Sequence, residues 1–155
     1  MKKQLKGFSE QEVYDLYKYL CIYENKIKIL KTSTEIYKQY PQLNIIEETL
    51  NLFTINYSND EAMQILGIFV PKGFVYCTNT KSSKVYNLLY HLRNSIAHGQ
   101  IEKENEQVLL IDYKFAKDRS SKRLRKVFSG RGNLDSSIVF KIIEIINNTI
   151  ELWEV

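Results

Sequence analysis

Cysteines, prolines and long hydrophobic runs are scarce in this sequence of 155 residues. Cys21 and Cys77 are two isolated thiols without CxxC spacing, so the sequence gives no sign of a disulfide-forming compartment. No segment approaches the roughly 18 continuous apolar residues of a membrane span. Residues 1–6 also lead into no apolar stretch of the kind a secretory signal needs. We therefore expect a soluble protein of the reducing cytoplasm that has no membrane partner.

The length is sufficient for one compact domain, which buries about 68–70% of its unfolded surface and needs neither a disulfide nor a metal to fold. The chain contains no internal repeat, no low-complexity tract and no linker. We therefore expect residues 1–155 to form a single domain. The formal net charge of +4 indicates an anionic partner only weakly, because the sum does not say where the charge lies.

Apolar residues recur at three- and four-residue steps along much of the chain, a spacing typical of amphipathic helices. The first helix begins at Ser9, which with Glu12 has the pattern of a capping box. Three shorter helical segments follow at residues 34–40, 43–53 and 60–69. The first half of the chain is therefore predicted to be helical.

Residues 72–81 look irregular, and the central helix follows them. Ser82 or Ser83 is suited to cap its start. Its apolar residues lie on one core-facing side, and Gly99 is suited to the left-handed position that follows a helix.

Residues 108–113 are rich in strand-forming residues and are expected to pair with residues 125–128 as a small hairpin. A last amphipathic helix is predicted to start at Leu134. The fold class that follows is mainly α: a helical bundle with a small basic β-hairpin, at about residues 107–131, inserted before the C-terminal helix.

The nine residues 91–99 concentrate the chemistry of the chain, because they include both histidines, His91 and His98, together with Arg93 and Gly99. A histidine titrates near neutrality, whereas an arginine stays cationic at every accessible pH. This combination suits acid/base chemistry on a phosphodiester. The segment therefore predicts a nuclease.

Helical geometry restricts how this site can be assembled. At about 100° per residue, Arg93 and His98 differ by about 140° around a continuous helix and do not meet easily within one chain. Either the helix unwinds just before Gly99, or two chains pair so that each cleft collects groups from both subunits. We favour the two-fold dimer, in which one histidine acts as base and its twin as acid.

The sequence Arg93-Asn94-Ser95-Ile96-Ala97-His98 has the form Arg-polar-x-x-x-His near the end of an apolar helix. In this motif and in the helical order around it, the chain resembles the higher eukaryote and prokaryote nucleotide-binding family, called HEPN. The resemblance implies a dimerising helical-bundle domain, and many members are metal-independent endoribonucleases of toxin, abortive-infection or other defence systems. It also implies that Arg93 and His98 line a cleft at the dimer interface, with Asn94 as the supporting polar residue. The hairpin is not part of the minimal family pattern.

The chemistry implied by this resemblance is attack of the RNA 2′-hydroxyl on the neighbouring phosphorus, with no cofactor or metal. His98 would move the proton, Arg93 would stabilise charge on the phosphate oxygens, and Asn94 could orient His98 one turn later. An alternative, non-catalytic role for His98 is to contact the last carbonyl groups of the helix. His91 is expected on the helix surface or at an interface. A metal site shared by the two histidines is rejected, because two turns separate them by about 10 Å along the axis.

The net positive charge of the chain comes entirely from one segment, residues 114–131. This segment has eight basic residues against one acid, a charge of +7, whereas the rest of the chain has 14 basic and 17 acidic residues, a charge of −3. Interleaved with Phe115 and Phe128, these cations suit phosphate contact and stacking on unpaired bases. The alternative is a solvated loop that protects a sheet edge from aggregation. The candidate RNA-binding residues are Lys117, Arg119, Lys122, Arg123, Arg125, Lys126 and Arg131.

Two other functions remain open at this point. Some relatives implied by the resemblance lack catalysis, so the chain can instead be a dimeric module that binds RNA or protein through charge alone. It can also be the toxin of a pair whose antitoxin, such as a small nucleotidyltransferase, neutralises the hairpin or covers the cleft. The partners expected are therefore RNA, a second copy of the chain and an antitoxin.

Overall fold

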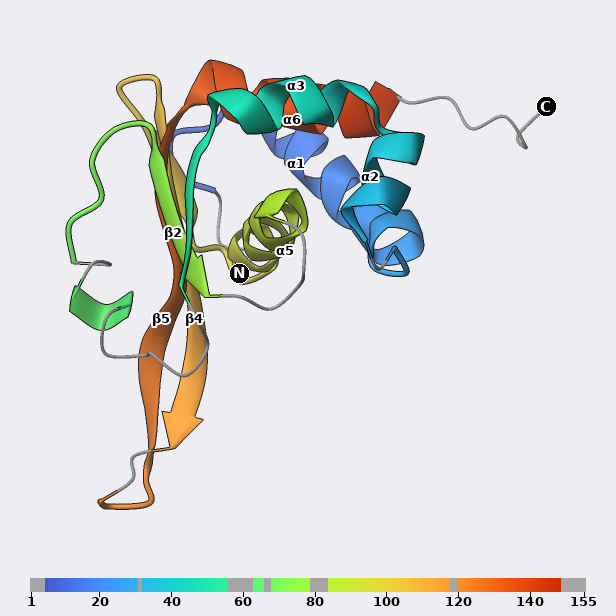
Figure 1. Ribbon diagram of the computed structural model, residues 1–155. Helices are drawn as coiled ribbons and strands as arrows, with labels where there is room; N and C mark the ends of the chain where they lie inside the picture. The colour runs from blue at the N-terminus through green and yellow to red at the C-terminus, as the bar shows by residue number, and fades with distance from the viewer. Residues whose placement is uncertain are drawn as a thin grey trace.

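A computed structural model describes residues 5–30, 32–55, 63–65, 68–78, 84–117 and 120–148. A twisted sheet forms one layer, and helices cover one of its faces (Figure 1). In chain order the elements are α1 (Glu10–Ile22), the π-helical turn η1 (Tyr23–Ile27), α2 (Ser33–Gln39), α3 (Gln42–Thr49), β1 (Asn51–Ile55), β2 (Phe74–Thr78), α5 (Lys84–Ala97), β3 (Ile101–Glu104), β4 (Gln107–Lys117), β5 (Leu124–Asp135) and α6 (Ser136–Asn148).

The sheet has five strands in the order β1-β2-β5-β4-β3. β1 runs parallel to β2, and the other neighbours are antiparallel. The predicted mainly helical bundle with a small hairpin is therefore wrong, because the fold is mixed α/β and the sheet occupies most of the C-terminal half. The predicted hairpin exists, but it is the centre of a larger sheet.

Three strands, β1, β2 and β3, were missed, and β3 lies in a segment predicted as a charged turn over residues 102–106. β1 lies in the segment predicted as helical up to residue 53, where α3 ends at Thr49, and β2 lies in the segment predicted as irregular. Both are only five residues long, and β2 is built from aromatic and β-branched side chains that favour strands. A strand this short gains its stability from neighbouring strands, which a local pattern does not reveal.

The capping box predicted at Ser9 is confirmed. The Ser9 hydroxyl accepts from the Glu12 backbone N–H at 3.2 Å, and the Glu12 carboxylate accepts from the Ser9 N–H at 2.9 Å. The same carboxylate accepts from the Lys103 ammonium at 2.9 Å, which ties the start of α1 to β3. Burial raises the pKa of Glu12, but the hydrogen bonds from Ser9 and the charge of Lys103 outweigh it and hold the pKa below its ordinary value of 4.5.

Because this carboxyl has a lowered pKa in the folded state, its stabilising effect is present above pH 4.5 and is lost as the pH falls through the folded value. We expect Glu12→Gln to reduce the free energy of unfolding at pH 7 by about 0.5–1 kcal/mol, since the ion pair is partly exposed. The difference from wild type should shrink as the pH falls below 4.5. Urea unfolding at pH 7 and pH 3.5 measures it, and an equal difference at both pH values would contradict the assignment.

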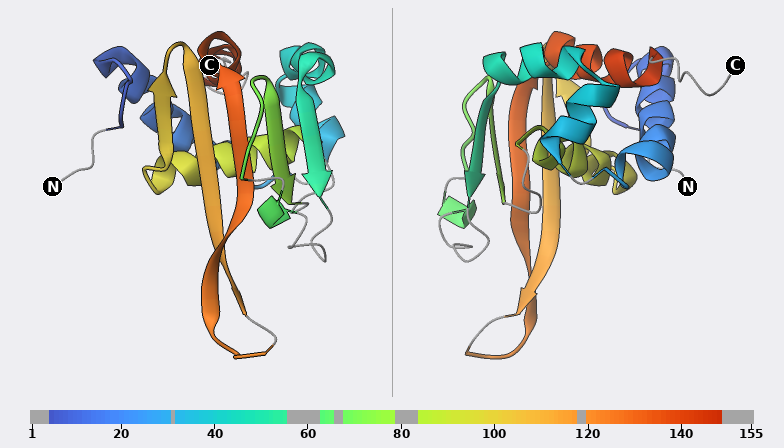
Figure 2. Two further views of the ribbon diagram at one scale, coloured as in Figure 1. Left: turned by 90° about the vertical axis from the view of Figure 1, so that its left-hand side faces the viewer. Right: turned by 45° about the vertical axis from the view of Figure 1, so that its right-hand side comes forward.

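α5 is the central helix of the core. It lies against the inner face of the sheet and is surrounded by α1, α2 and α3 (Figures 1 and 2). Its end is a Schellman motif: the Gly99 N–H donates to Ile96 O at 3.1 Å and the Gln100 N–H to Ser95 O at 2.7 Å, with Gly99 at φ +65°. The predicted glycine stop is therefore confirmed. The predicted cap residues at 82 and 83 lie outside the described residues.

The hairpin of β4 and β5 continues well beyond the rest of the sheet (Figure 2). Asp112 pairs with Gly130 and Tyr113 with Phe128, so a β-bulge at Ser129 shifts the register between them. Beyond the bulge, the Gln64 side chain donates to Phe128 O at 3.1 Å and accepts from the Phe128 N–H at 3.0 Å. Gln64 thus satisfies the backbone of β5 at the point where its pairing with β2, which reaches Gly130, has ended.

Within the parts of the chain that the structure describes, no helix is both long and apolar enough to cross a bilayer.

Candidate functional site

Arg93 lies on α5 at a cavity of about 260 Å³ between α5 and η1. Its Nε donates to Glu24 Oε1 at 2.5 Å, and its Nη1 donates to Asn94 Oδ1 at 2.8 Å. Both side chains of the ion pair are about one-third exposed, at 29% and 34%. The guanidinium is therefore oriented by two acceptors and still reaches solvent, as a phosphate-binding arginine must.

The rest of this cavity wall consists of Asn94, Lys28 and three tyrosines, Tyr23, Tyr86 and Tyr90. Burial raises the pKa of Tyr23 and of Tyr86, so their phenols stay neutral. Lys28 lies 3.5 Å from Glu24, which leaves two cations and one carboxylate among the ionised groups of the wall. The cavity therefore favours an anion.

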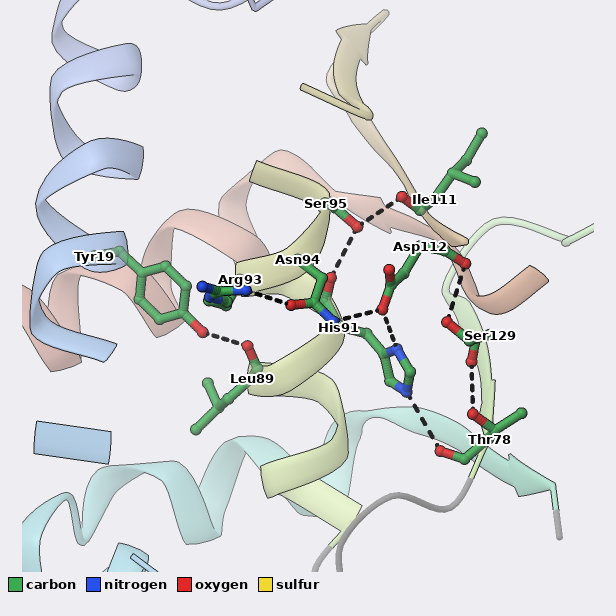
Figure 3. A network of polar contacts seen from close by, with 10 residues as sticks. All are labelled: Tyr19, Thr78, Leu89, His91, Arg93, Asn94, Ser95, Ile111, Asp112 and Ser129. Carbon is green, nitrogen blue, oxygen red and sulfur yellow. Dashed lines mark hydrogen bonds and ion pairs between the residues drawn. The ribbon is translucent and has the colours of Figure 1, made fainter. Parts of the chain in front are cut away.

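Behind Arg93 a buried polar network joins α5 to the sheet (Figure 3). Asn94 Nδ2 donates to Asp112 Oδ2 at 2.9 Å, and the same oxygen lies 2.8 Å from His91 Nδ1. The other ring nitrogen of His91 lies 3.3 Å from the Thr78 carbonyl. His91 is 0% exposed and Asp112 is 2% exposed. Asp112 thus holds Asn94, and Asn94 in turn holds Arg93.

The expected position of His91 on the helix surface or at an interface is therefore wrong, because its own chain buries it completely. His91 faces the sheet because α5 approaches β5 closely at Gly130, where a Cβ would lie 2.8 Å from His91 Cγ. Only glycine fits such a close approach between a helix side chain and a strand backbone. A histidine inside the apolar face of a helix was a usable signal for this burial.

Two partners of the site, Glu24 and Asp112, were missed from the sequence. Asp112 follows Val108 and Leu110 at two-residue steps on β4, and all three are buried. A carboxylate at the third inward position of an apolar strand was the signal that it has a partner. For Glu24 we find no local signal, because its contact with Arg93 joins residues 69 positions apart.

His98 follows the last residue of α5 and is exposed. Its N–H donates to the Asn94 carbonyl at 3.0 Å, so the helix continues through His98 and does not unwind before Gly99. Arg93 and His98 consequently stay on different sides of one chain. The Asn94 side chain contacts Arg93 and Asp112 rather than His98, so the expected orientation of His98 by Asn94 is absent.

The capping role of His98 is also unnecessary, since the Schellman motif already satisfies the carbonyls of Ser95 and Ile96. Among the described residues, the His98 side chain has no hydrogen-bond partner. An exposed imidazole without such a partner is available for proton transfer.

The basic residues of the hairpin divide between its two faces. Side chains at paired positions share a face, and successive positions alternate. Arg125, paired with Ala116, is on the face that continues toward α5, whereas Lys117, Lys126 and Arg131 are on the outer face. Arg119 lies outside the described residues. Lys122 and Arg123 are exposed in the turn between the strands.

Within the described parts of the chain, no three His, Cys, Asp or Glu side chains gather as metal ligands do. The absence of a metal from the reaction remains a prediction, which chelation tests directly.

The chain has a buried central helix with an Arg-Asn-x-x-x-His segment at its end, and comparison with known families matches a HEPN-family domain over nearly the whole chain. Specifically, the family model described as HEPN pEK499 p136 matches residues 3–148, so the chain belongs to that family. The resemblance noted from the motif is thereby confirmed. No curated protein and no solved structure matches the chain significantly.

Proposed function

We propose that this protein is a metal-independent endoribonuclease of a toxin, abortive-infection or related defence system, and that it acts as a homodimer. One observation carries the proposal, namely the different environments of the two motif residues. The Arg93 side chain is held in a fixed orientation at the wall of a cavity that favours an anion, whereas His98 is exposed and its side chain has no hydrogen-bond partner among the described residues. Because the continuous helix keeps the two apart, a second subunit is needed to bring His98 to Arg93. Membership of the HEPN family supports this chemistry.

In the proposed reaction, His98 removes the proton from the RNA 2′-hydroxyl. The 2′-oxygen forms a bond to the neighbouring phosphorus as the bond from phosphorus to the 5′-oxygen breaks. A proton from the partner subunit's His98 goes to the departing 5′-oxygen, which leaves a 2′,3′-cyclic phosphate and a 5′-hydroxyl. Arg93 stabilises the charge on the phosphate oxygens, and Asn94, anchored to Asp112, keeps the guanidinium in place.

The proposal is tested by incubating the purified protein with labelled tRNA and total RNA in EDTA. We expect cleavage products that end in a cyclic phosphate, and none with the double variant Arg93→Ala/His98→Ala. DNA of the same sequence should survive, because it lacks the attacking hydroxyl. Cleavage of DNA, or loss of RNA cleavage when EDTA is the only change, would contradict the proposed chemistry.

The second candidate function is a dimeric module that binds RNA through the hairpin without cutting it. It is favoured by the separation of Arg93 from His98 within one chain and by the exposed cations of the hairpin. In the same assay it predicts RNA binding that weakens steeply with salt and no products. An antitoxin, such as a small nucleotidyltransferase, would act in either case by covering the hairpin or the cleft.

A further inference from the structure

The outer face of the hairpin carries alternating rings and cations. By the register of β4 and β5, this face includes Tyr113, Phe115 and Lys117 from one strand and Leu124, Lys126, Phe128 and Arg131 from the other. No helix covers this part of the sheet in the left view of Figure 2. Phe115 and Leu124 are 70% and 69% exposed, which is unusual for large apolar side chains.

The aromatic rings and cations of this face contact one another. The rings of Tyr113 and Phe128 are stacked, with centroids 5.0 Å apart and an interplanar angle of 27°. Lys126 Nζ lies 4.2 Å from the Tyr113 centroid, and Arg131 Cζ lies 4.9 Å from the Phe128 centroid. These two rings thus have a cation over one face and each other's ring on the other, whereas the exposed ring of Phe115 is open to a further partner. An exposed ring with cations on the same face matches what unpaired bases and their phosphates require.

The same face continues into a cavity of about 710 Å³. Tyr113, Lys126 and Arg131 belong to both the hairpin face and the cavity wall. Leu109 and Ile111 extend the wall with apolar surface. This volume lies within the range of about 300–1,000 Å³ found for small-ligand sites.

The same cavity borders the candidate catalytic segment. Gly99 and Gln100, the two residues that follow His98, line it. A strand of nucleic acid that lies on the hairpin and enters the cavity would contact Gly99 and Gln100, next to His98 in the chain. Arg93 lines a different cavity, so this outer-face site is distinct from the one that orients the arginine.

We infer that the outer face of the β4–β5 hairpin, together with the 710 Å³ cavity, is a binding site for unpaired RNA, with bases stacked on the hairpin rings and one nucleotide held in the cavity beside the segment of His98. This inference rests on the proposed function and names the substrate class of the site. A duplex hides its bases in the stack, so it can use only the cations of this surface.

The test measures binding of a fluorescein-labelled 12-nucleotide uridine RNA and of a 12-base-pair RNA duplex by fluorescence anisotropy. The His98→Ala protein is used as the background, so that cleavage does not interfere. We expect the single strand to bind more tightly than the duplex. Phe115→Leu keeps an apolar side chain but removes the ring, and should weaken single-strand binding about 5- to 150-fold, the value of one stacked base, without changing its salt dependence.

Two neighbouring cations of the hairpin test whether RNA binds the outer face and not the face toward α5. Lys126 and Arg125 are adjacent and exposed but lie on opposite faces. Lys126→Ala should lower the slope of log Kd against log salt by about 1. The face assignment removes Arg125 from the candidate RNA-binding residues, so Arg125→Ala should leave the slope unchanged. Arg131→Gln should weaken binding of the single strand as well, because it removes a cation of the cavity wall.

Equal effects of Lys126→Ala and Arg125→Ala, equal binding of single strand and duplex, or no effect of Phe115→Leu would overturn the inference. The absence of any RNA binding would also overturn the inference, and a protein would then be the remaining candidate partner for this face. These outcomes are distinguishable from those that test the proposed function. If the protein binds single strands but the wild type does not cleave RNA, the binding site stands and the proposed nuclease activity fails. If the wild type cleaves RNA and Phe115→Leu does not change the cleavage, the nuclease activity stands and the binding site fails.

Discussion

His98→Ala is expected to reduce RNA cleavage by about 10²- to 10⁴-fold, the usual contribution of a well-placed proton-transfer group. The substitution should leave the fold unchanged, because His98 is exposed and its side chain has no hydrogen-bond partner among the described residues. Cleavage of labelled tRNA measures the loss, and circular dichroism and the mass in solution check the fold and the assembly. His98→Gln should be as inactive as the alanine variant, since an amide bonds but does not transfer a proton at neutral pH. Lys18→Ala, an exposed substitution on α1, serves as the control and should remain active.

Mixing two inactive variants tests whether each site is shared between subunits. In a heterodimer of Arg93→Ala and His98→Ala chains, one composite cleft has an intact Arg93 from one subunit and an intact His98 from the other. Random exchange should therefore leave about a quarter of all clefts with one intact Arg93 and one intact His98 from the opposite subunit. Each of these clefts lacks the partner histidine, so a low recovered rate also measures how much the second histidine contributes. No recovery after demonstrated subunit exchange would contradict a site that one arginine and the opposite histidine can form.

Asp112→Ala is expected to reduce the free energy of unfolding by about 3–5 kcal/mol, because it leaves the buried His91 and the partly buried Asn94 without their shared partner. Asp112 accepts from Asn94 and lies 2.8 Å from His91, and neither the carboxylate nor the imidazole reaches solvent. Asp112→Asn keeps the shape and an acceptor oxygen, so we expect a smaller cost, about 1–3 kcal/mol. Urea unfolding measures both.

Asp15→Asn is the matched control, since Asp15 lies near the surface of α1 and accepts from Gln11 at 3.0 Å. Its cost should stay within about 0.5 kcal/mol. Asp112→Asn also tests the positioning of Arg93 through Asn94. At a temperature where this variant is folded, we expect a lower kcat for RNA cleavage with little change in RNA binding. A folded variant with unchanged kcat would show that the network is structural only.

Several elements were predictable because their signals are local. The capping box of Ser9 and Glu12 spans three residues, and the Gly99 stop depends on bonds to Ser95 and Ile96 within five residues. A hairpin of β4 and β5 was predicted too, but residues 108–113 pair with residues 128–134 and not with 125–128, and the strands extend to Lys117 and Asp135. β5 includes Gly130 and Gly132, residues that disfavour strands, and they are explained by the close approach of His91 and of Val75 and Leu110.

The candidate site was only partly predictable, because only some of its signals are local. Arg93, Asn94 and His98 were identified from their spacing on one helix. Their environments were not: Glu24 lies 69 positions from Arg93, and Asp112 lies 18 positions from Asn94. The geometric obstacle to a site within one chain was foreseen, and the continuous helix through His98 removes one of the two solutions considered.

By itself, the sequence determined the course of α5, the concentration of positive charge in residues 114–131 and the membership of the HEPN family, because each of these depends on residue types and short spacings. Only the tertiary structure decided that His91 is buried, that Asp112 supports Arg93 through Asn94, and which cations share a face with the exposed rings. These outcomes depend on which strand pairs with which and on how closely α5 approaches the sheet. Such contacts join residues far apart in the chain, and a local pattern does not encode them.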